Sequence, residues 1–160
     1  MRMGNGESSS SERQIFIEKI RRMNLDSLTR ELTAFLNDPD LGVQWEALNQ
    51  LLDLDFPAHV DAAIKMLKSE SELIRGAICY KLRAMPDKRT LEALTDVLLN
   101  DSSGTNRFWA ADALGSIGDL KALSSLERAR DYDVGTDYEG RPISLSARMA
   151  VEEILSRNQK

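Results

Sequence analysis

The sequence has 160 residues, enough for one domain of ordinary size, and a formal net charge of −5. An acidic balance argues against a dedicated nucleic-acid-binding domain, which normally carries a basic excess, and no apolar run approaches the roughly 18 residues that a membrane span needs. One cysteine and one histidine exclude an internal disulfide framework, a cysteine-rich zinc site and a multi-histidine metal site.

The chain begins with a polar segment. Residues 1–11 are rich in Gly and Ser and lack the hydrophobic stretch of a secretory signal. We expect them to form a disordered leader ahead of one repeat domain over residues 12–157. Without a signal peptide the expected location is the cytoplasm, where Cys79 stays a thiol.

The rest of the chain has the periodicity of helices. Ile15, Phe16, Ile20 and Met23 form one apolar stripe, and residues 25–36 contain a second. No stretch alternates apolar and polar residues for long enough to be a strand. Short Pro-, Gly-, Asp- and Ser-containing breaks separate segments of about 10 to 15 residues. The pattern predicts about eight helices and no sheet.

These segments repeat. Residues 43–51, 74–82, 106–114 and 146–154 align at successive offsets of 31, 32 and 40 residues. Their apolar columns fall on one helical face, and a second apolar helix follows each of the first three copies. A two-helix unit of this length predicts a stacked solenoid. The positions expected to be almost fully buried are Leu48, Leu51, Leu82, Ala110, Ala111, Leu114 and Ile154; a further column, filled by Leu54, Met85 and Ile117, is also expected to be apolar and inward.

Residues 101–119 carry a family resemblance. They read Asp-Ser-Ser-Gly-Thr-Asn-Arg-Phe-Trp-Ala-Ala-Asp-Ala-Leu-Gly-Ser-Ile-Gly-Asp and resemble a HEAT repeat, more narrowly the short HEAT-like repeats named after the phycobilisome lyases. The resemblance covers residues 25–157. It implies an all-α, right-handed α-solenoid of about four HEAT-like helical hairpins.

The resemblance also implies a polar ladder, in which an Asp lies six residues before an Arg. The Asp column holds Asp38, Ser69 and Asp101, and the Arg column holds Gln44, Arg75 and Arg107. We expect Asp101 to contact Arg107 or to cap the helix that starts near Asn106. We also expect Arg75 to lie near Asp38 or Asp101. The physical role is to satisfy backbone groups at helix starts.

No motif for chemistry is complete. Phosphate-binding, dinucleotide-binding and zinc-protease patterns are missing. His59 has the position of a surface or capping residue, and Cys79 that of an inert core residue. The acidic loop over residues 131–142 resembles a calcium loop, but Thr136 and Pro142 stand where Gly and Glu are required. The sequence therefore predicts no catalytic residue, no cofactor and no metal.

A partner site is expected on the second helices of the repeats. Their face has a basic lean, and the loop over residues 131–142 is either a solvated connection or a protruding contact loop. The predicted partner-binding residues are Arg89, Lys121, Arg128, Tyr132 and Tyr138. Trp45 and Phe108 belong to the other helix layer, where they either pack between repeats or form a separate convex surface.

The sequence on its own favours a non-enzymatic protein-interaction module. We expect this scaffold to bind a protein or peptide partner through the solenoid surface, with no nucleic acid and no membrane. The resemblance implies one alternative, an accessory or lyase-like protein for bilin attachment to a phycobiliprotein. A DNA-binding role, as in HEAT-like alkylation-repeat glycosylases, fits poorly with the acidic charge.

Overall fold

The computed structural model describes residue 15 and residues 25–159. The expected leader over residues 1–11, the start of the predicted domain and most of the first apolar stripe lie outside the described residues. The described part contains seven α-helices, and its one β feature is an isolated bridge between Thr136 and Pro142. The predicted all-α solenoid class is confirmed. The helices are α2 (Leu25–Phe35), α3 (Leu41–Met66), α4 (Glu72–Ala84), α5 (Leu91–Asn100), α6 (Gly104–Ile117), α7 (Leu123–Tyr132) and α8 (Ile143–Asn158), with short 3-10 helices η1 (Lys88–Thr90) and η2 (Leu120–Ala122).

The chain divides into two compact units at residues 55 and 56. The division falls inside α3, where Asp55 leaves the helical conformation with φ −156° and ψ 84°. Pro57 follows two residues later, and a proline removes a backbone donor and restricts the residue before it. The helix is therefore two helices joined at a bend, as the sequence break at residues 56–57 predicts.

The first unit, up to Asp55, contains one described hairpin made of α2 and the first part of α3. Leu32, Ala47 and Leu51 form its buried cluster, and Phe35 packs against them. The turn is closed by Asp40, whose carboxylate accepts the backbone N–H of Gly42 at 2.7 Å. Asp40 therefore caps α3, because its carboxylate accepts backbone N–H groups that have no partner within the helix.

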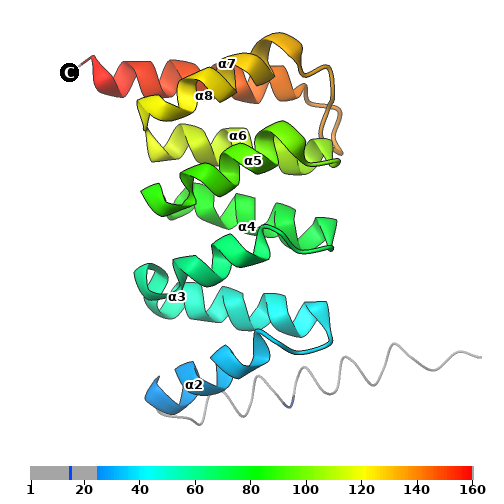
Figure 1. Ribbon diagram of the computed structural model, residues 1–160, viewed down its shortest axis with the longest axis vertical. Helices are drawn as coiled ribbons and strands as arrows, with labels where there is room; N and C mark the ends of the chain where they lie inside the picture. Colours follow the sequence, from blue (N-terminus) through cyan, green and yellow to red (C-terminus); the bar gives the residue numbers. More distant parts are fainter. Residues whose placement is uncertain (1–14, 16–24, 160) are drawn as a thin grey trace, which may run out of the picture. The chain divides into compact units, whose positions relative to one another are not determined.

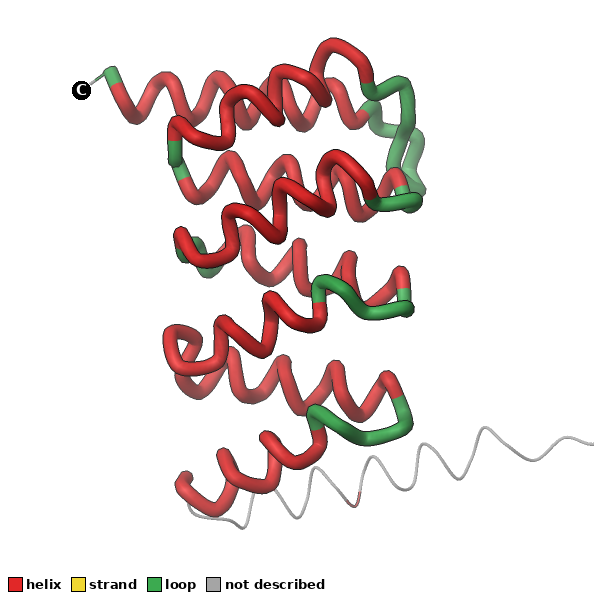
Figure 2. The backbone as a smooth tube through the Cα atoms, in the orientation of Figure 1, coloured by secondary structure: helices red, strands yellow, loops and turns green. Residues whose placement is uncertain are grey.

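The second unit, from Phe56 onward, is a layered array (Figures 1 and 2). Helices α4, α6 and α8 lie side by side in one layer, with α6 in the middle, and α5 and α7 form the other layer. This alternation follows from the hairpin repeat, because each hairpin buries its apolar face against the next.

Repeated caps define the helix ends in this unit. Ser71 and Ser103 cap α4 and α6, each accepting a backbone N–H three residues ahead. Asp87 and Asp119 cap the two 3-10 helices, each accepting a backbone N–H two residues ahead. Gly118 ends α6 with φ 67°, a left-handed conformation that favours glycine. Both pairs of caps are 32 residues apart, so the repeat is encoded locally.

The predicted core is confirmed, with one exception. All seven residues expected to be buried are at most 1% exposed: Leu48, Leu51, Leu82, Ala110, Ala111, Leu114 and Ile154. The column of Leu54, Met85 and Ile117 is wrong at its first position, since Leu54 is 40% exposed, and Met85 and Ile117 are only half-buried. Leu54 directly precedes the bend at Asp55, and the loss of helical geometry there turns it out of the buried face. Among the described residues, no helix is long and apolar enough to cross a membrane.

Candidate functional site: the groove between α5 and α7

The polar ladder links neighbouring repeats in the second unit. The guanidinium of Arg75 pairs with Asp101 at 2.6 Å and donates to the carbonyl of Ser69 at 2.7 Å. The guanidinium of Arg107 pairs with Asp133 at 2.7 Å and donates to the carbonyl of Asp101 at 2.8 Å. Each arginine thus holds its own helix start to the aspartate of the next repeat.

The ladder predictions are confirmed, although the contact to Arg107 uses the backbone. Arg75 lies beside Asp101, as expected. Asp101 meets Arg107 through its carbonyl, while its carboxylate accepts from the backbone N–H of Ser103 and the side-chain amide of Asn106. In the first unit, Gln44 donates to the carbonyl of Asp38 at 2.6 Å and so keeps the backbone half of the interaction.

Asp133 is the ladder residue that the sequence prediction missed. It lies 32 residues after Asp101, but aligning the last copy at an offset of 40 placed it inside the loop. The extra residues begin after Asp133, so the period of 32 holds up to that point. Burial alone would raise the pKa of Asp133, but hydrogen bonds from Arg107 and the backbone of Gly135 outweigh it and hold the pKa below its usual value.

The loop after Asp133 is internally bonded. Asp137 is buried and accepts from the backbone N–H groups of Glu139 and Arg141, and its carboxylate pairs with the guanidinium of Arg141 at 2.6 Å. Burial opposes ionisation, yet the bonds from Arg141 keep the pKa of Asp137 lowered. The loop therefore has a defined conformation, and whether it acts as a contact loop or as a solvated connection stays a prediction.

The loop folds against the layer of α4, α6 and α8. Tyr138 donates its backbone N–H to the hydroxyl of Thr105, at the start of α6. The guanidinium of Arg141 lies 4.5 Å from the ring centre of Phe108 and 5.5 Å from that of Trp109. Tyr80 meets Trp109 edge-on at 4.9 Å. Phe108 thus packs within its own layer, while Trp45 belongs to the first unit.

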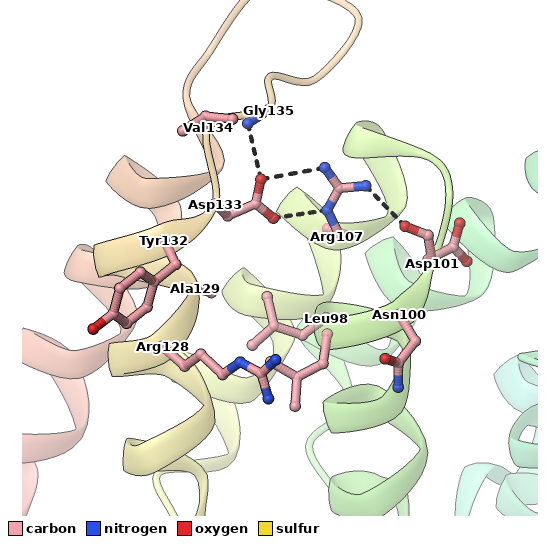
Figure 3. Close-up of a pocket in the computed structure, with 11 residues that line it drawn as sticks. Leu98, Asn100, Asp101, Arg107, Arg128, Ala129, Tyr132, Asp133, Val134 and Gly135 are labelled. Carbon is pink, nitrogen blue, oxygen red and sulfur yellow. Dashed lines mark hydrogen bonds and ion pairs between the residues drawn. The ribbon is translucent and has the colours of Figure 1, made fainter.

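A groove lies between the C-terminal ends of α5 and α7 (Figure 3). Its volume is about 410 Å³. Arg128 reaches from α7 toward Leu98 of α5, and the Arg107–Asp133 pair closes one end. We call this the α5–α7 groove; it is lined by Leu98, Leu99, Asn100, Asp101, Arg107, Arg128, Ala129, Tyr132, Asp133, Val134 and Gly135.

Two of the five predicted partner-binding residues line this groove, namely Arg128 and Tyr132. Arg89 is held by Asp87 at 2.7 Å and by the carbonyl of Pro57. Lys121 lies in η2, at the opposite end of α7, and Tyr138 lies beside Thr105. The five residues therefore do not share one lining: the loop carries Tyr138 toward the other layer, and Arg89 and Lys121 lie in the 3-10 helices outside the groove. Val134, Asn100 and Leu98 are groove residues that the sequence prediction did not include.

Cys79 lies in the core, as expected, whereas His59 is neither fully exposed nor at an end of α3. Cys79 is buried, and burial raises the pKa of its thiol to about 12, far from a usable nucleophile. His59 is half-buried in the second part of α3. Within the part of the chain that the structure describes, no three His, Cys, Asp or Glu side chains gather in a way that could hold a metal ion.

Comparison with known proteins identifies the family. The family model for HEAT repeats matches residues 29–114 and 60–138. These matches cover more than half of the chain, and the chain belongs to the HEAT-repeat family. The narrower likeness to phycobilisome-lyase repeats stays a prediction.

Curated relatives share part of the chain. It is 32% identical to deoxyhypusine hydroxylase of Gallus gallus over 89 residues, which cover 55% of this chain and 30% of the relative. It is 34% identical to deoxyhypusine hydroxylase of Drosophila pseudoobscura pseudoobscura over 95 residues, or 58% and 32% of the two chains. It is 35% identical to deoxyhypusine hydroxylase-B of Oryza sativa subsp. japonica over 85 residues, or 52% and 28%. The chain spans about a third of the length of the curated relatives that it matches.

These relatives overturn two expectations. The prediction of a non-enzymatic interaction module is wrong, because the similar curated proteins are hydroxylases, and the alternative of bilin attachment finds no support among them. The sequence argument weighed reactive residues within this chain alone.

Proposed function

We propose that this chain takes part in hydroxylation of the deoxyhypusine hydroxylase type. In this role, its repeats bind the protein or peptide substrate of the hydroxylase. The observation that carries the proposal is the identity of 32–35% to three deoxyhypusine hydroxylases. The α5–α7 groove supports a binding role, because it combines Arg128, which forms no ion pair within the described part of the chain, with the exposed side chains of Tyr132 and Val134. A cytoplasmic location belongs to the same proposal, supported by the free thiol of Cys79.

The described residues do not fit a metal centre of their own. Hydroxylation inserts oxygen into a C–H bond, and enzymes use a metal or another redox group for it. Three closely placed ligands are the usual minimum, and the described residues contain no such cluster. The whole sequence contains one His and one Cys. We therefore assign no oxidation step to these side chains, and the proposed role is substrate binding.

A depletion experiment tests this role. Extract of the source cells, depleted of the chain, is incubated with a deoxyhypusine-containing peptide, and mass spectrometry follows the gain of one oxygen atom. We expect depletion to reduce the hydroxylation rate at least tenfold and the purified chain to restore it. Restoration should fail with the core variant Leu114→Asp, because a charge would replace a fully buried leucine on α6. Equal hydroxylation with and without the chain would contradict the proposal.

A further inference from the structure

At one end of the α5–α7 groove, every charged side chain of the ladder is paired with an opposite charge. Arg107 is held by Asp133 on one side and by the carbonyl of Asp101 on another, and Asp133 also accepts the backbone N–H of Gly135 at 2.9 Å. The carboxylate of Asp101 is neutralised by Arg75. The four ladder groups therefore cancel one another and fix the wall of the groove.

Arg128 is the charged residue of the groove lining that has no oppositely charged partner among the described residues. It is exposed on α7 and forms no ion pair with any residue in the described part of the chain. The neighbouring cation Arg130 differs, since Asp131 holds it at 2.7 Å. A guanidinium lying in a groove with uncommitted donors favours a carboxylate, which it can bind through two parallel hydrogen bonds.

Apolar surface surrounds this cation. Tyr132 is 78% exposed and Val134 is 99% exposed. Leu98 and Ala129 form the buried base between the two helices. Val134 directly follows Asp133 in the chain, so the ladder holds it in place although it contacts almost nothing. Exposed Tyr beside Arg is a typical composition of protein-binding surfaces.

A second groove, one repeat earlier, shows which of these features are specific. It measures about 390 Å³ and has the equivalent ladder pair, Arg75 and Asp101. Asp96 takes the place of Arg128 there, and Ser102 takes the place of Val134. The ladder pair is thus a common part of the repeat. The second groove has a cation of a different kind, Lys68, at the position that Asn100 takes in the α5–α7 groove. The guanidinium at the position of Arg128 and the exposed aliphatic side chain belong to the α5–α7 groove alone of the two.

We propose that the α5–α7 groove binds an extended acidic segment of a protein, with a carboxylate on Arg128 and a neighbouring apolar side chain against Tyr132 and Val134. The inference rests on the proposed function in one respect, because that function makes the segment part of the substrate protein. An extended chain points alternate side chains in opposite directions and advances about 3.3 Å per residue. An acid and an apolar residue close together in such a chain reach both features.

The test is binding of a labelled peptide by fluorescence anisotropy. The probe contains three repeats of Gly-Glu-Leu, and the matched probe has Gln in place of Glu. We expect the acidic probe to bind the intact chain and the Gln probe to bind at least tenfold more weakly. We expect Arg128→Gln to weaken binding of the acidic probe at least tenfold, which is about 1.4 kcal/mol.

The matched control is Arg130→Gln, which changes the net charge equally on the same helix but outside the groove lining. It should leave binding within twofold. Equal losses in the two variants would reduce the effect to general charge attraction and overturn the proposal, as would unchanged binding by Arg128→Gln. The depletion experiment uses a different readout. Arg128-dependent peptide binding without chain-dependent hydroxylation would uphold the groove and reject the proposed function.

Discussion

Individual carboxylates in this protein have opposite effects on its stability. Asp133 is 15% exposed and accepts from Arg107, which keeps its pKa low. Asp112 also has an arginine partner, since Arg83 lies 2.7 Å away. Nevertheless, burial raises the pKa of Asp112, and the nearby Glu153 adds to the effect. The difference lies in what opposes burial: hydrogen bonds from Arg107 and the backbone N–H of Gly135 lower the pKa of Asp133, whereas the charges of Arg83 and Arg141 alone oppose burial at Asp112.

The sign of each contribution follows from the direction of the pKa change. A lowered pKa means that Asp133 stabilises the folded state above the unfolded-state value of about 3.9, and that this stabilisation is lost as the pH falls through the folded-state pKa. A raised pKa means the reverse for Asp112. Its contribution is most favourable below the unfolded-state pKa and is lost as the pH rises through the folded-state pKa.

Asp133→Asn should therefore lower the free energy of unfolding at pH 7 by about 2 kcal/mol, the usual contribution of a hydrogen-bonded charged group. It should also flatten the loss of stability below about pH 4. Urea unfolding at several pH values measures both effects. A variant as stable as the parent at pH 7 would mean that the ladder pair contributes no stability.

Asp112→Asn is the matched comparison. It removes a partly desolvated charge together with an ion pair that is half-exposed on the Arg83 side. We expect the free energy of unfolding at pH 7 to stay equal or to rise by up to about 1 kcal/mol. A loss as large as that of Asp133→Asn would show that burial does not dominate at this position.

At the scale of helices, α4 and α6 are joined by a buried amide. Asn106 is 1% exposed and donates to the carbonyl of Glu72 at 3.1 Å, while its backbone N–H bonds the Ser103 cap. Gly76 on α4 leaves the space for this side chain, because a Cβ at that position would meet the Asn106 oxygen. Gly76 and Asn106 therefore fit together: the missing side chain of Gly76 makes room for the amide of Asn106.

Gly76→Ala should lower the free energy of unfolding by about 1 to 2 kcal/mol. Alanine favours the helix by about 1 kcal/mol over glycine, but displacing Asn106 leaves buried polar groups without partners. In an Asn106→Ala background the same substitution should become neutral or stabilising, because the obstacle is gone. Thermal unfolding of the four proteins in this cycle measures the coupling. Additive effects would show that the two residues act independently.

Helix positions and core residues could be predicted from the sequence because both depend on local periodicity. Leu82 and Ile154 are buried for the reason that their spacing indicates, whereas the side-chain cap of α6 is Ser103, two residues after the Asp101 named from the sequence. Asp133 could also have been found, since the period of 32 residues reaches it.

The groove could not be predicted in the same way. Whether Arg128 shares a site with Tyr132 or with Tyr138 depends on the path of the loop. That path is fixed by non-local contacts such as Tyr138 to Thr105 and Arg141 to Phe108. From the sequence, Arg89 is as good a candidate for partner binding as Arg128. In the structure, its guanidinium pairs with Asp87 and donates to the carbonyl of Pro57. Ion pairs and hydrogen bonds between residues far apart in the sequence can be identified only from the structure.

At the scale of the molecule, the second unit is an array in which each helix contacts its neighbours. Such proteins gain stability from nearest-neighbour interfaces, so the position of a helix in the array determines how readily it opens. α6 has α4 and α8 on its two sides and α5 in the other layer (Figure 1). α8 packs on α6 and α7 and exposes Met149 and Leu155.

Amide hydrogen exchange should reveal this order. We expect the amides of residues 110–114 in α6 to exchange at least tenfold more slowly than those of residues 152–156 in α8, after correction for intrinsic rates. The reason is that opening α6 breaks interfaces on both of its sides, whereas the end of α8 opens against fewer contacts. Asp133→Asn should narrow the difference, because it breaks the ladder between α6 and the segment that leads into α8. Equal protection in the two helices of the parent protein would instead mean that residues 56–160 open as one cooperative unit, and that the nearest-neighbour description does not hold for this array.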